Sequence, residues 1–220
     1  MIQQLTDIDT GVFLFFNGMH SPFWDGFMFA YSGKWIWLPL YAALLAVLLR
    51  NYDKRSVMAF AAAVALMVFF TDFFTSSVVR PHVMRLRPSN PDNPISGLVH
   101  VVQNYRGGSF GFPSAHSSNV WGLAVFSALV FRKPAVCGFM ALWAAVTCYS
   151  RLYLGVHYPG DLLSGMLVGI TGAGGAYWVF KLAGGKPAGR LEWEWLPAAV
   201  GSATIAYIAA VSATDILGVF

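Results

Sequence analysis

The chain has 220 residues, of which 57% are apolar and only 11% charged, and its mean hydropathy is +0.59. Because a soluble domain carries about a quarter charged residues, this composition excludes an ordinary soluble domain, and it is too apolar for a disordered chain. The net charge of +4 comes without a basic run, so nothing indicates a nucleic-acid partner, and we expect an integral membrane protein.

The first apolar segment, residues 11–31, is interrupted by polar residues and a proline between Asn17 and Asp25. A full span there would bury polar groups without partners, so we predict an interfacial or re-entrant segment. Runs of about twenty apolar residues predict the true spans. In chain order these are 34–49, 56–79, 117–131, 134–149, 161–180 and an additional C-terminal span at 195–213. The predicted fold is an all-α polytopic membrane bundle of about six transmembrane helices, forming one domain over residues 1–220 with its core at about 34–180.

Basic residues in the connections predict the orientation of the spans. In a six-span arrangement three basic connections, around residues 50–55, 132–133 and 181–190, fall on one side. We expect that side to be cytoplasmic. The connections 80–117 and 150–160 then face outward, and they also contain arginines that topology does not explain.

The first polar cluster opens the long outward connection with Arg80, Arg85 and Arg87, followed by Pro88. Arginines at a membrane boundary commonly extend toward lipid head groups. Taken alone, this segment supports that interpretation as well as a functional one. Pro88 is expected to end any helix that enters the connection.

The second cluster lies just before the third predicted span. Ser114 can cap that helix, whose N-terminus offers free backbone N–H groups and a positive dipole end suited to a bound phosphate. His116 falls in its first turn. A lone histidine there is more commonly a polar contact than a catalyst, so both interpretations stay open.

The third cluster runs from Ser150 to Asp161. His157 and Asp161 are four positions apart, and they can form a hydrogen-bonded pair in which the acid fixes the tautomer and leaves the other nitrogen free to attack. A metal site is the weaker interpretation, because only the other histidines could supply further nitrogen ligands.

Together, in this order, the clusters form a three-part pattern. It consists of Arg80, six residues and Arg87-Pro88; then Pro113-Ser114-x-His116; then Ser150-Arg151, five residues, His157, three residues and Asp161. The chain thereby resembles the type 2 phosphatidic acid phosphatase (PAP2) superfamily, membrane lipid phosphatases that share a core with vanadium haloperoxidases. Two positions depart from the family pattern. Arg80 stands where lysine is usual, which keeps the charge, and Ala115 replaces a glycine, which would cause strain if that position needs positive φ.

The resemblance implies a phosphatase that needs no metal or cofactor and works through a phosphohistidine. His157 would be the nucleophile, Asp161 would orient it, and His116 would protonate the leaving oxygen. The residues expected to hold the phosphoryl oxygens are Arg80, Arg87, Arg151, Ser114 and Ala115. Ser150 and Asp72 are secondary candidates. Asp72 lies inside the second predicted span, where a carboxylate needs a partner, so a structural role is the stronger interpretation.

The expected partners are a phosphate-bearing membrane lipid and the bilayer, with no nucleic acid and no obligatory protein partner. The interrupted N-terminal segment and the extra C-terminal span resemble lipid A 4′-phosphatases of the Bacteroides type. The predicted substrate is therefore a lipid A-type 4′-phosphate or undecaprenyl diphosphate, with phosphatidylglycerophosphate as an alternative. The implied location is a bacterial inner membrane, with the active site facing the periplasm.

Two other functional classes stay open. A non-catalytic lipid-phosphate carrier or flippase would explain the arginines, but not two histidines accompanied by a carboxylate. Haloperoxidase-like chemistry with bound vanadate shares the motifs, but a membrane-embedded site argues against it. Release of phosphate in the presence of EDTA distinguishes a phosphatase from a carrier.

Overall fold

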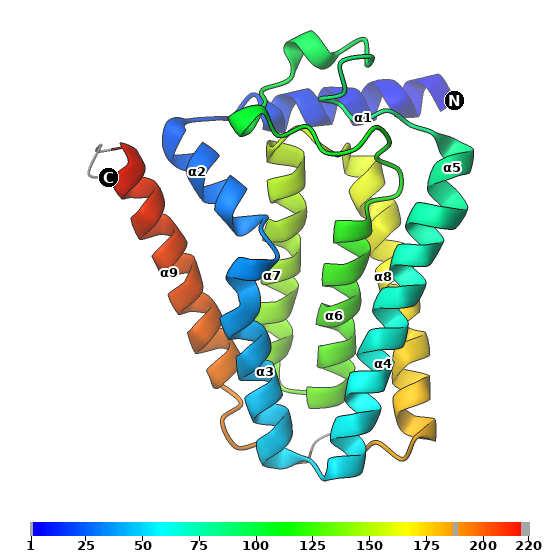
Figure 1. Cartoon of the computed structure of the whole chain (residues 1–220), viewed down its shortest axis with the longest axis vertical. Coiled ribbons are helices and arrows are strands. Elements are labelled where there is room, and N and C mark those ends of the chain that lie inside the picture. The colour runs from blue at the N-terminus through cyan, green and yellow to red at the C-terminus, as the bar shows by residue number, and fades with distance from the viewer. Residues whose placement is uncertain (1, 187–188, 217–220) are drawn as a thin grey trace.

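The computed structural model describes residues 2–186 and 189–216, and all regular structure in these ranges is helical. In chain order the helices are α1 (Ile2–Asn17), α2 (Pro22–Tyr31), α3 (Leu38–Asn51), α4 (Lys54–Phe73), α5 (Arg80–Val83), α6 (Ala115–Phe131), α7 (Pro134–Tyr153), α8 (Pro159–Leu182) and α9 (Leu196–Ile216). A π-helical segment, η2 (Phe74–Val79), joins α4 to α5, and the 3₁₀ turns are η1 (Trp35–Trp37), η3 (Ser96–Leu98) and η4 (Val102–Asn104). The protein is a polytopic all-α bundle, as the sequence predicts (Figure 1).

Four described helices are long and apolar enough to cross a membrane: Lys54–Val83, Pro134–Tyr153, Pro159–Leu182 and Leu196–Thr214. A further crossing is made if α2 and the segment Trp35–Asn51 count as one span, broken by a 71° bend. Helix α6 is also apolar but has only 17 residues. The helical class of the prediction is confirmed, and the number of six spans stays a prediction.

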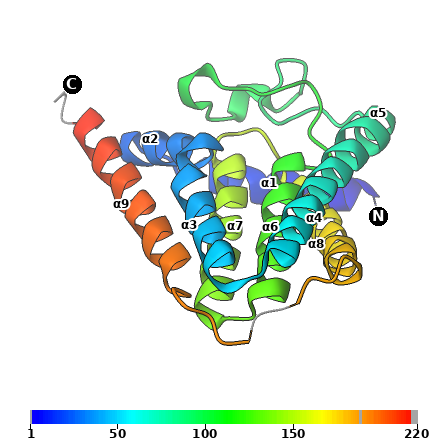
Figure 2. The same ribbon diagram turned by 60° about the horizontal axis from the view of Figure 1, so that its bottom comes forward.

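The two ends of the bundle differ in what covers them (Figures 1 and 2). The turns α3–α4, α6–α7 and α8–α9, which carry the basic connections, lie together at one end. Helix α1 lies across the opposite end, beside the loop 84–114. The predicted interfacial segment therefore divides into two parts. Its first part lies in α1, and its second part, α2, packs beside α9 and α7.

Helices α6 and α8 pack closely and bring their N-termini together. A Cβ atom at Gly165 would lie 2.3 Å from the carbonyl oxygen of Ser114, and one at Gly169 would lie 2.3 Å from that of Ser118. Only glycine permits such an approach. The backbone N–H of Ser114 also donates to the carbonyl of Asp161 at 3.0 Å. The first turns of α6 and α8 are thus fixed against each other.

Candidate active site

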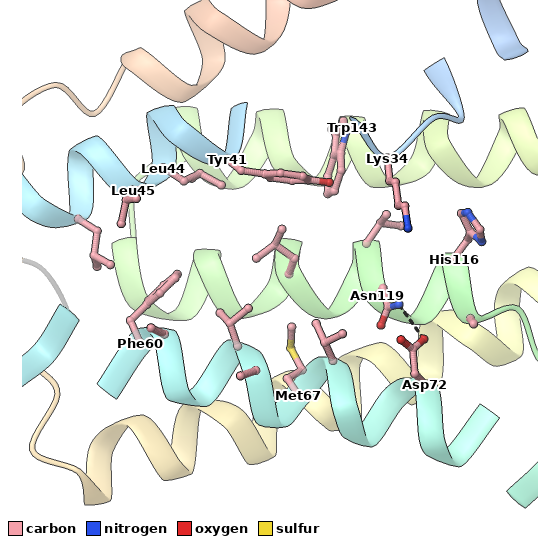
Figure 3. Close-up of a pocket in the computed structure, with 18 of the residues that line it drawn as sticks. Lys34, Tyr41, Leu44, Leu45, Phe60, Met67, Asp72, His116, Asn119 and Trp143 are labelled. Carbon is pink, nitrogen blue, oxygen red and sulfur yellow. Dashed lines mark hydrogen bonds between the residues drawn. The ribbon is translucent and has the colours of Figure 1, made fainter. Parts of the chain in front are cut away.

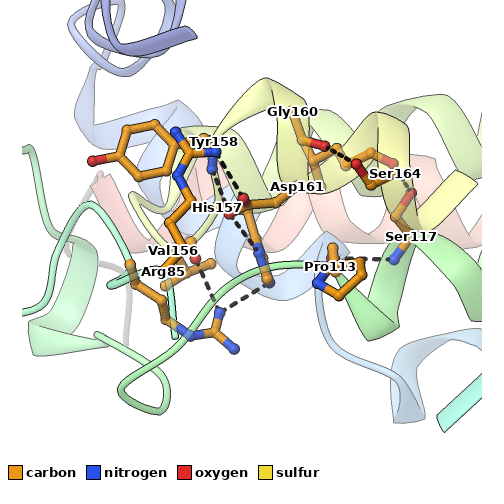
Figure 4. A network of polar contacts seen from close by, with 12 residues as sticks. Arg85, Pro113, Ser117, Val156, His157, Tyr158, Gly160, Asp161 and Ser164 are labelled. Atoms are coloured by element: carbon orange, nitrogen blue, oxygen red, sulfur yellow. Dashed lines mark hydrogen bonds and ion pairs between the residues drawn. The ribbon is translucent and has the colours of Figure 1, made fainter. Parts of the chain in front are cut away.

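His157 lies in the short turn between α7 and α8, and its side chain is only 1% exposed. Its Nδ1 is 3.4 Å from Oδ2 of Asp161, one turn into α8 (Figure 4). Its Nε2 is 2.9 Å from Nη1 of Arg87. Because a guanidinium can only donate hydrogen bonds, Nε2 must be the accepting nitrogen. The ring proton therefore lies on Nδ1, facing the carboxylate, and a lone pair is available on Nε2.

Asp161 is held by three groups besides His157. Its Oδ2 accepts the backbone N–H of Tyr158 at 3.0 Å, and its Oδ1 accepts from Nη1 of Arg85 at 3.0 Å. Gly111 of the loop also packs closely against Asp161: a Cβ atom at Gly111 would lie only 2.8 Å from Oδ2 of Asp161. The sequence pattern did not predict a role for Arg85, although this residue lies within the first cluster.

The three predicted phosphate-binding arginines come from α5, the loop that follows it and α7, and the charges of all three act on His157. Arg87 also donates to the carbonyl of Val156 at 3.0 Å, and Arg80 donates to that of Pro113 at 3.2 Å. Arg151 donates to the hydroxyls of Ser32 at 2.6 Å and Tyr105 at 2.9 Å, two contacts that the sequence did not predict. These bonds fix the direction of each guanidinium.

The arginine cluster is short of acceptors. The Nε atoms of Arg80, Arg87 and Arg151 are buried and have no hydrogen-bond partner among the described residues. Burial, and then the charges of Arg151 and Arg80, lower the pKa of Arg87 to about 10. Burial, followed by the charges of the same three arginines, also lowers the pKa of His157 well below its usual value. Unpaired donors and crowded positive charge both favour a bound anion.

His116 lies in the first turn of α6 and is exposed to a cavity between α3, α4 and α6. No described residue forms a hydrogen bond with its ring. The cavity has a volume of about 850 Å³. Figure 3 shows His116, Lys34, Asp72 and Asn119 gathered at one end, and mainly apolar side chains line the rest. Asp72 accepts a hydrogen bond from Nδ2 of Asn119 at 2.9 Å, which gives this intramembrane carboxylate the polar partner it requires.

The remaining predicted site residues have local roles in the helices. The hydroxyl of Ser114 caps α6 by accepting the N–H of Ser117 at 3.3 Å. Ala115 begins α6 and is not among the described residues with positive φ, so replacing the family glycine causes no strain there. The hydroxyl of Ser150 donates to the carbonyl of Thr147 at 2.7 Å, and its hydrogen bond is therefore made within α7. Among the described residues, no three His, Cys, Asp or Glu side chains form a group that could hold a metal ion.

The sequence pattern of the PAP2 superfamily matches residues 56–184. The chain is 50% identical to a lipid A 4′-phosphatase of Bacteroides thetaiotaomicron over 192 residues, which cover 87% of this chain and 84% of that protein. It is 32% identical to a lipid A 4′-phosphatase of Porphyromonas gingivalis, over 83% of this chain and 77% of that protein.

Among solved structures, the fold is similar to that of LpxE from Aquifex aeolicus. The TM-score is 0.54, and the match covers 77% of this chain and 94% of that one. Only 20% of the aligned residues are identical, so this likeness concerns the fold.

Proposed function

The chain belongs to the PAP2 superfamily and is a phosphatase of that family, and on this premise we propose that it hydrolyses the phosphate monoester of a lipid A-type glycolipid through a phosphohistidine on His157. The observation that carries the mechanism is the set of three arginines around one buried histidine, each with an unpaired buried Nε. The substrate class is supported by the relative that is 50% identical over 87% of the chain and is named a lipid A 4′-phosphatase.

In the first step, the lone pair on Nε2 of His157 attacks phosphorus and the P–N bond forms. The bond from phosphorus to the leaving oxygen breaks, and its electron pair stays on that oxygen, which takes a proton from His116. The Nδ1 proton remains on the ring, where Asp161 stabilises the positive charge of the phosphorylated imidazole. The N–H of Arg87 that now points at Nε2 would then donate to a phosphoryl oxygen.

In the second step, water attacks the phosphorus of the phosphohistidine while His116 takes one of its protons. The P–N bond breaks, its electron pair returns to Nε2, and inorganic phosphate leaves. Positioning and charge stabilisation dominate phosphoryl transfer. Arg80, Arg87 and Arg151 would supply both, because the charge of each acts on His157 and each has a buried Nε without a hydrogen-bond partner among the described residues.

The cavity between α3, α4 and α6 is the proposed place for an acyl chain of the substrate. Its walls are mainly apolar along the helices, and its polar end contains His116. A lipid whose chain lies in this cavity would present its phosphate to the two histidines. Lys34 lies at the same polar end, where its charge would favour an anionic head group.

The proposed setting is a bacterial inner membrane with the site at the periplasmic face. The basic connections gather at the bundle end opposite the site, which agrees with positive-inside orientation. The exposed Asp92 allows a test, with Cys137 and Cys148 replaced first. A cysteine in place of Asp92 should react with a membrane-impermeant maleimide in intact cells. Labelling only after lysis would reverse the orientation.

A side-by-side assay of purified protein with EDTA tests the proposed activity. The substrates are a lipid A-type glycolipid with a 4′-phosphate, undecaprenyl diphosphate and phosphatidylglycerophosphate. We expect the highest kcat/KM for the glycolipid. Faster hydrolysis of either other lipid would reassign the substrate, and lipid binding without phosphate release would support a carrier.

A further inference from the structure

Helix α1 places a carboxylate against the candidate active site. Oδ2 of Asp9 lies 2.7 Å from Nη1 of Arg85, and its Oδ1 accepts the backbone N–H of Gly160 at 2.7 Å. The fit is tight, because a Cβ atom at Gly160 would lie 2.9 Å from Oδ2. Asp9 is far outside residues 56–184, which match the family pattern. This contact is therefore an addition to the family's three motifs.

Arg85 connects Asp9 to the histidine through a second carboxylate. The same Nη1 lies 3.0 Å from Oδ1 of Asp161, and the guanidinium lies over the ring of Tyr158 at 3.8 Å. The other oxygen of Asp161 faces Nδ1 of His157 at 3.4 Å (Figure 4). The exposed fractions of the Asp9 and Arg85 side chains are 15% and 23%, and that of Asp161 is 1%. These contacts lead from the partly exposed Asp9 on α1, through Arg85 and Asp161, to the fully buried imidazole of His157.

We propose that Asp9 is a positioning residue for His157 that acts through Arg85 and Asp161, so that helix α1 completes the active site. The proposal rests on the roles proposed above for His157 and Asp161. Asp9 takes part of the attraction of Arg85 and thereby keeps Asp161 from being drawn fully toward the guanidinium. The distance of 3.4 Å from Asp161 to Nδ1 is already long for a hydrogen bond, so a small withdrawal of the carboxylate would release the imidazole.

A purely structural role is the competing explanation, because Asp9 also accepts a backbone N–H in the first turn of α8. Asp9→Asn separates the two. The amide oxygen keeps an acceptor for Gly160, while the negative charge that faces Arg85 is lost. Asp7→Asn is the matched control, because Asp7 lies on the same helix, is exposed, and accepts a hydrogen bond from Gln3.

We expect Asp9→Asn to lower kcat about tenfold, with KM within about twofold, because the phosphate-binding arginines are untouched. Asp7→Asn should leave both constants unchanged. Asp9→Glu, which keeps the charge, should recover part of kcat. A normal kcat in Asp9→Asn, with thermal unfolding like that of the parent, would overturn the proposal. So would a loss in Asp9→Glu equal to that in Asp9→Asn.

The pH profile gives a readout that capping would not change. Removing the charge of Asp9 makes the surroundings of His157 more positive, which disfavours the imidazolium and lowers its pKa. The acid limb of kcat/KM should therefore move to lower pH, by on the order of half a unit. The charged or titratable groups that face the pair from the packed elements are Asp9, Arg80, Arg85, Arg87, His116, Arg151 and Tyr158. All but Asp9 are the same in both proteins, so an unchanged limb would contradict the proposal.

A double-mutant cycle tests the route through Arg85. If Asp9 acts only through that guanidinium, Asp9→Asn should have little further effect in an Arg85→Gln background. An undiminished tenfold loss in that background would overturn the route. His157→Ala in the same assay keeps the two proposals distinguishable. Retained activity in that variant contradicts the proposed function, whereas the Asp9 series tests the positioning only when His157 is essential.

Discussion

The two histidines at the helix starts have opposite surroundings. His157, before α8, is buried with one ring nitrogen facing Asp161 and the other facing Arg87. His116, in the first turn of α6, is exposed to the cavity, and no described residue forms a hydrogen bond with its ring. The difference fits two tasks. A nucleophile must present one lone pair in a fixed direction, whereas a proton donor must reach both a leaving oxygen and, later, a water molecule.

Replacing His157, the buried histidine with both ring nitrogens in contact, should have the largest effect. We expect His157→Ala to lose at least about 10⁴-fold in kcat, equally for a lipid monophosphate and for an activated aryl phosphate, because no phosphoenzyme can form. Phosphate release from the purified variant measures this, with thermal unfolding as the control for folding. Activity above about one per cent of the parent would break the assignment.

Replacing His116, the histidine exposed to the cavity, should have an effect that depends on the leaving group. In the phosphorylation step, measured as release of the leaving group in a single turnover, His116→Ala should lose about 10²–10⁴-fold on a lipid monophosphate. The loss in this step should be much smaller on p-nitrophenyl phosphate, whose leaving group needs little protonation. The comparison is made at matched pH with both substrates. Equal losses in this step would mean that His116 holds the phosphate and does not protonate the leaving oxygen, and the contrast between the histidines would then need another explanation.

The guanidinium that faces His157 offers a more graded test. Arg87→Lys keeps a positive charge but loses the guanidinium, whose Nη1 donates to the carbonyl of Val156 and faces Nε2 of His157. We expect kcat/KM to fall on the order of 10–100-fold, mostly through weaker holding of the phosphoryl group. A change within twofold would show that charge alone is sufficient at this position.

Much of this contrast could be predicted from the sequence, because the three motifs contain both histidines, Asp161 and three arginines. The sequence also predicts an interrupted first segment and the all-α bundle. It does not predict Asp9, which reaches Gly160 across 151 positions, or Ser32, which reaches Arg151 across 119. Such pairs depend on how the helices pack. Periodicity and motif spacing describe neighbours along the chain, and they carry no signal for a contact between helices outside the motifs.

The pH dependence follows from the surroundings of His157. Its pKa is lowered by burial first and then by the positive charges of Arg87, Arg151 and Arg80. A histidine with a lowered pKa stays neutral, and therefore nucleophilic, at pH values below the ordinary 6.5. The acid limb of kcat/KM that belongs to His157 should thus lie below pH 6.5. If the acid limb that belongs to His157 lies at or above pH 6.5, that result would contradict the burial of this ring.

Ser150 should show the smallest effect among the predicted site residues. Its hydroxyl donates within α7 to Thr147, so its removal leaves both histidines and their partners in place. We expect Ser150→Ala to change kcat and KM by less than about twofold and to lower stability slightly. A loss comparable to that of Arg87→Lys would bring Ser150 into the site and require a different rotamer during the reaction.

The most direct test of the account is to trap the phosphoenzyme. Purified protein is mixed with a ³²P-labelled aryl phosphate, quenched within milliseconds in base, and the labelled peptide is mapped. We expect a base-stable, acid-labile label on His157, which accumulates further in His116→Ala because attack by water is then slowed. A label on any other residue, or full turnover by a protein that never becomes labelled, would contradict it.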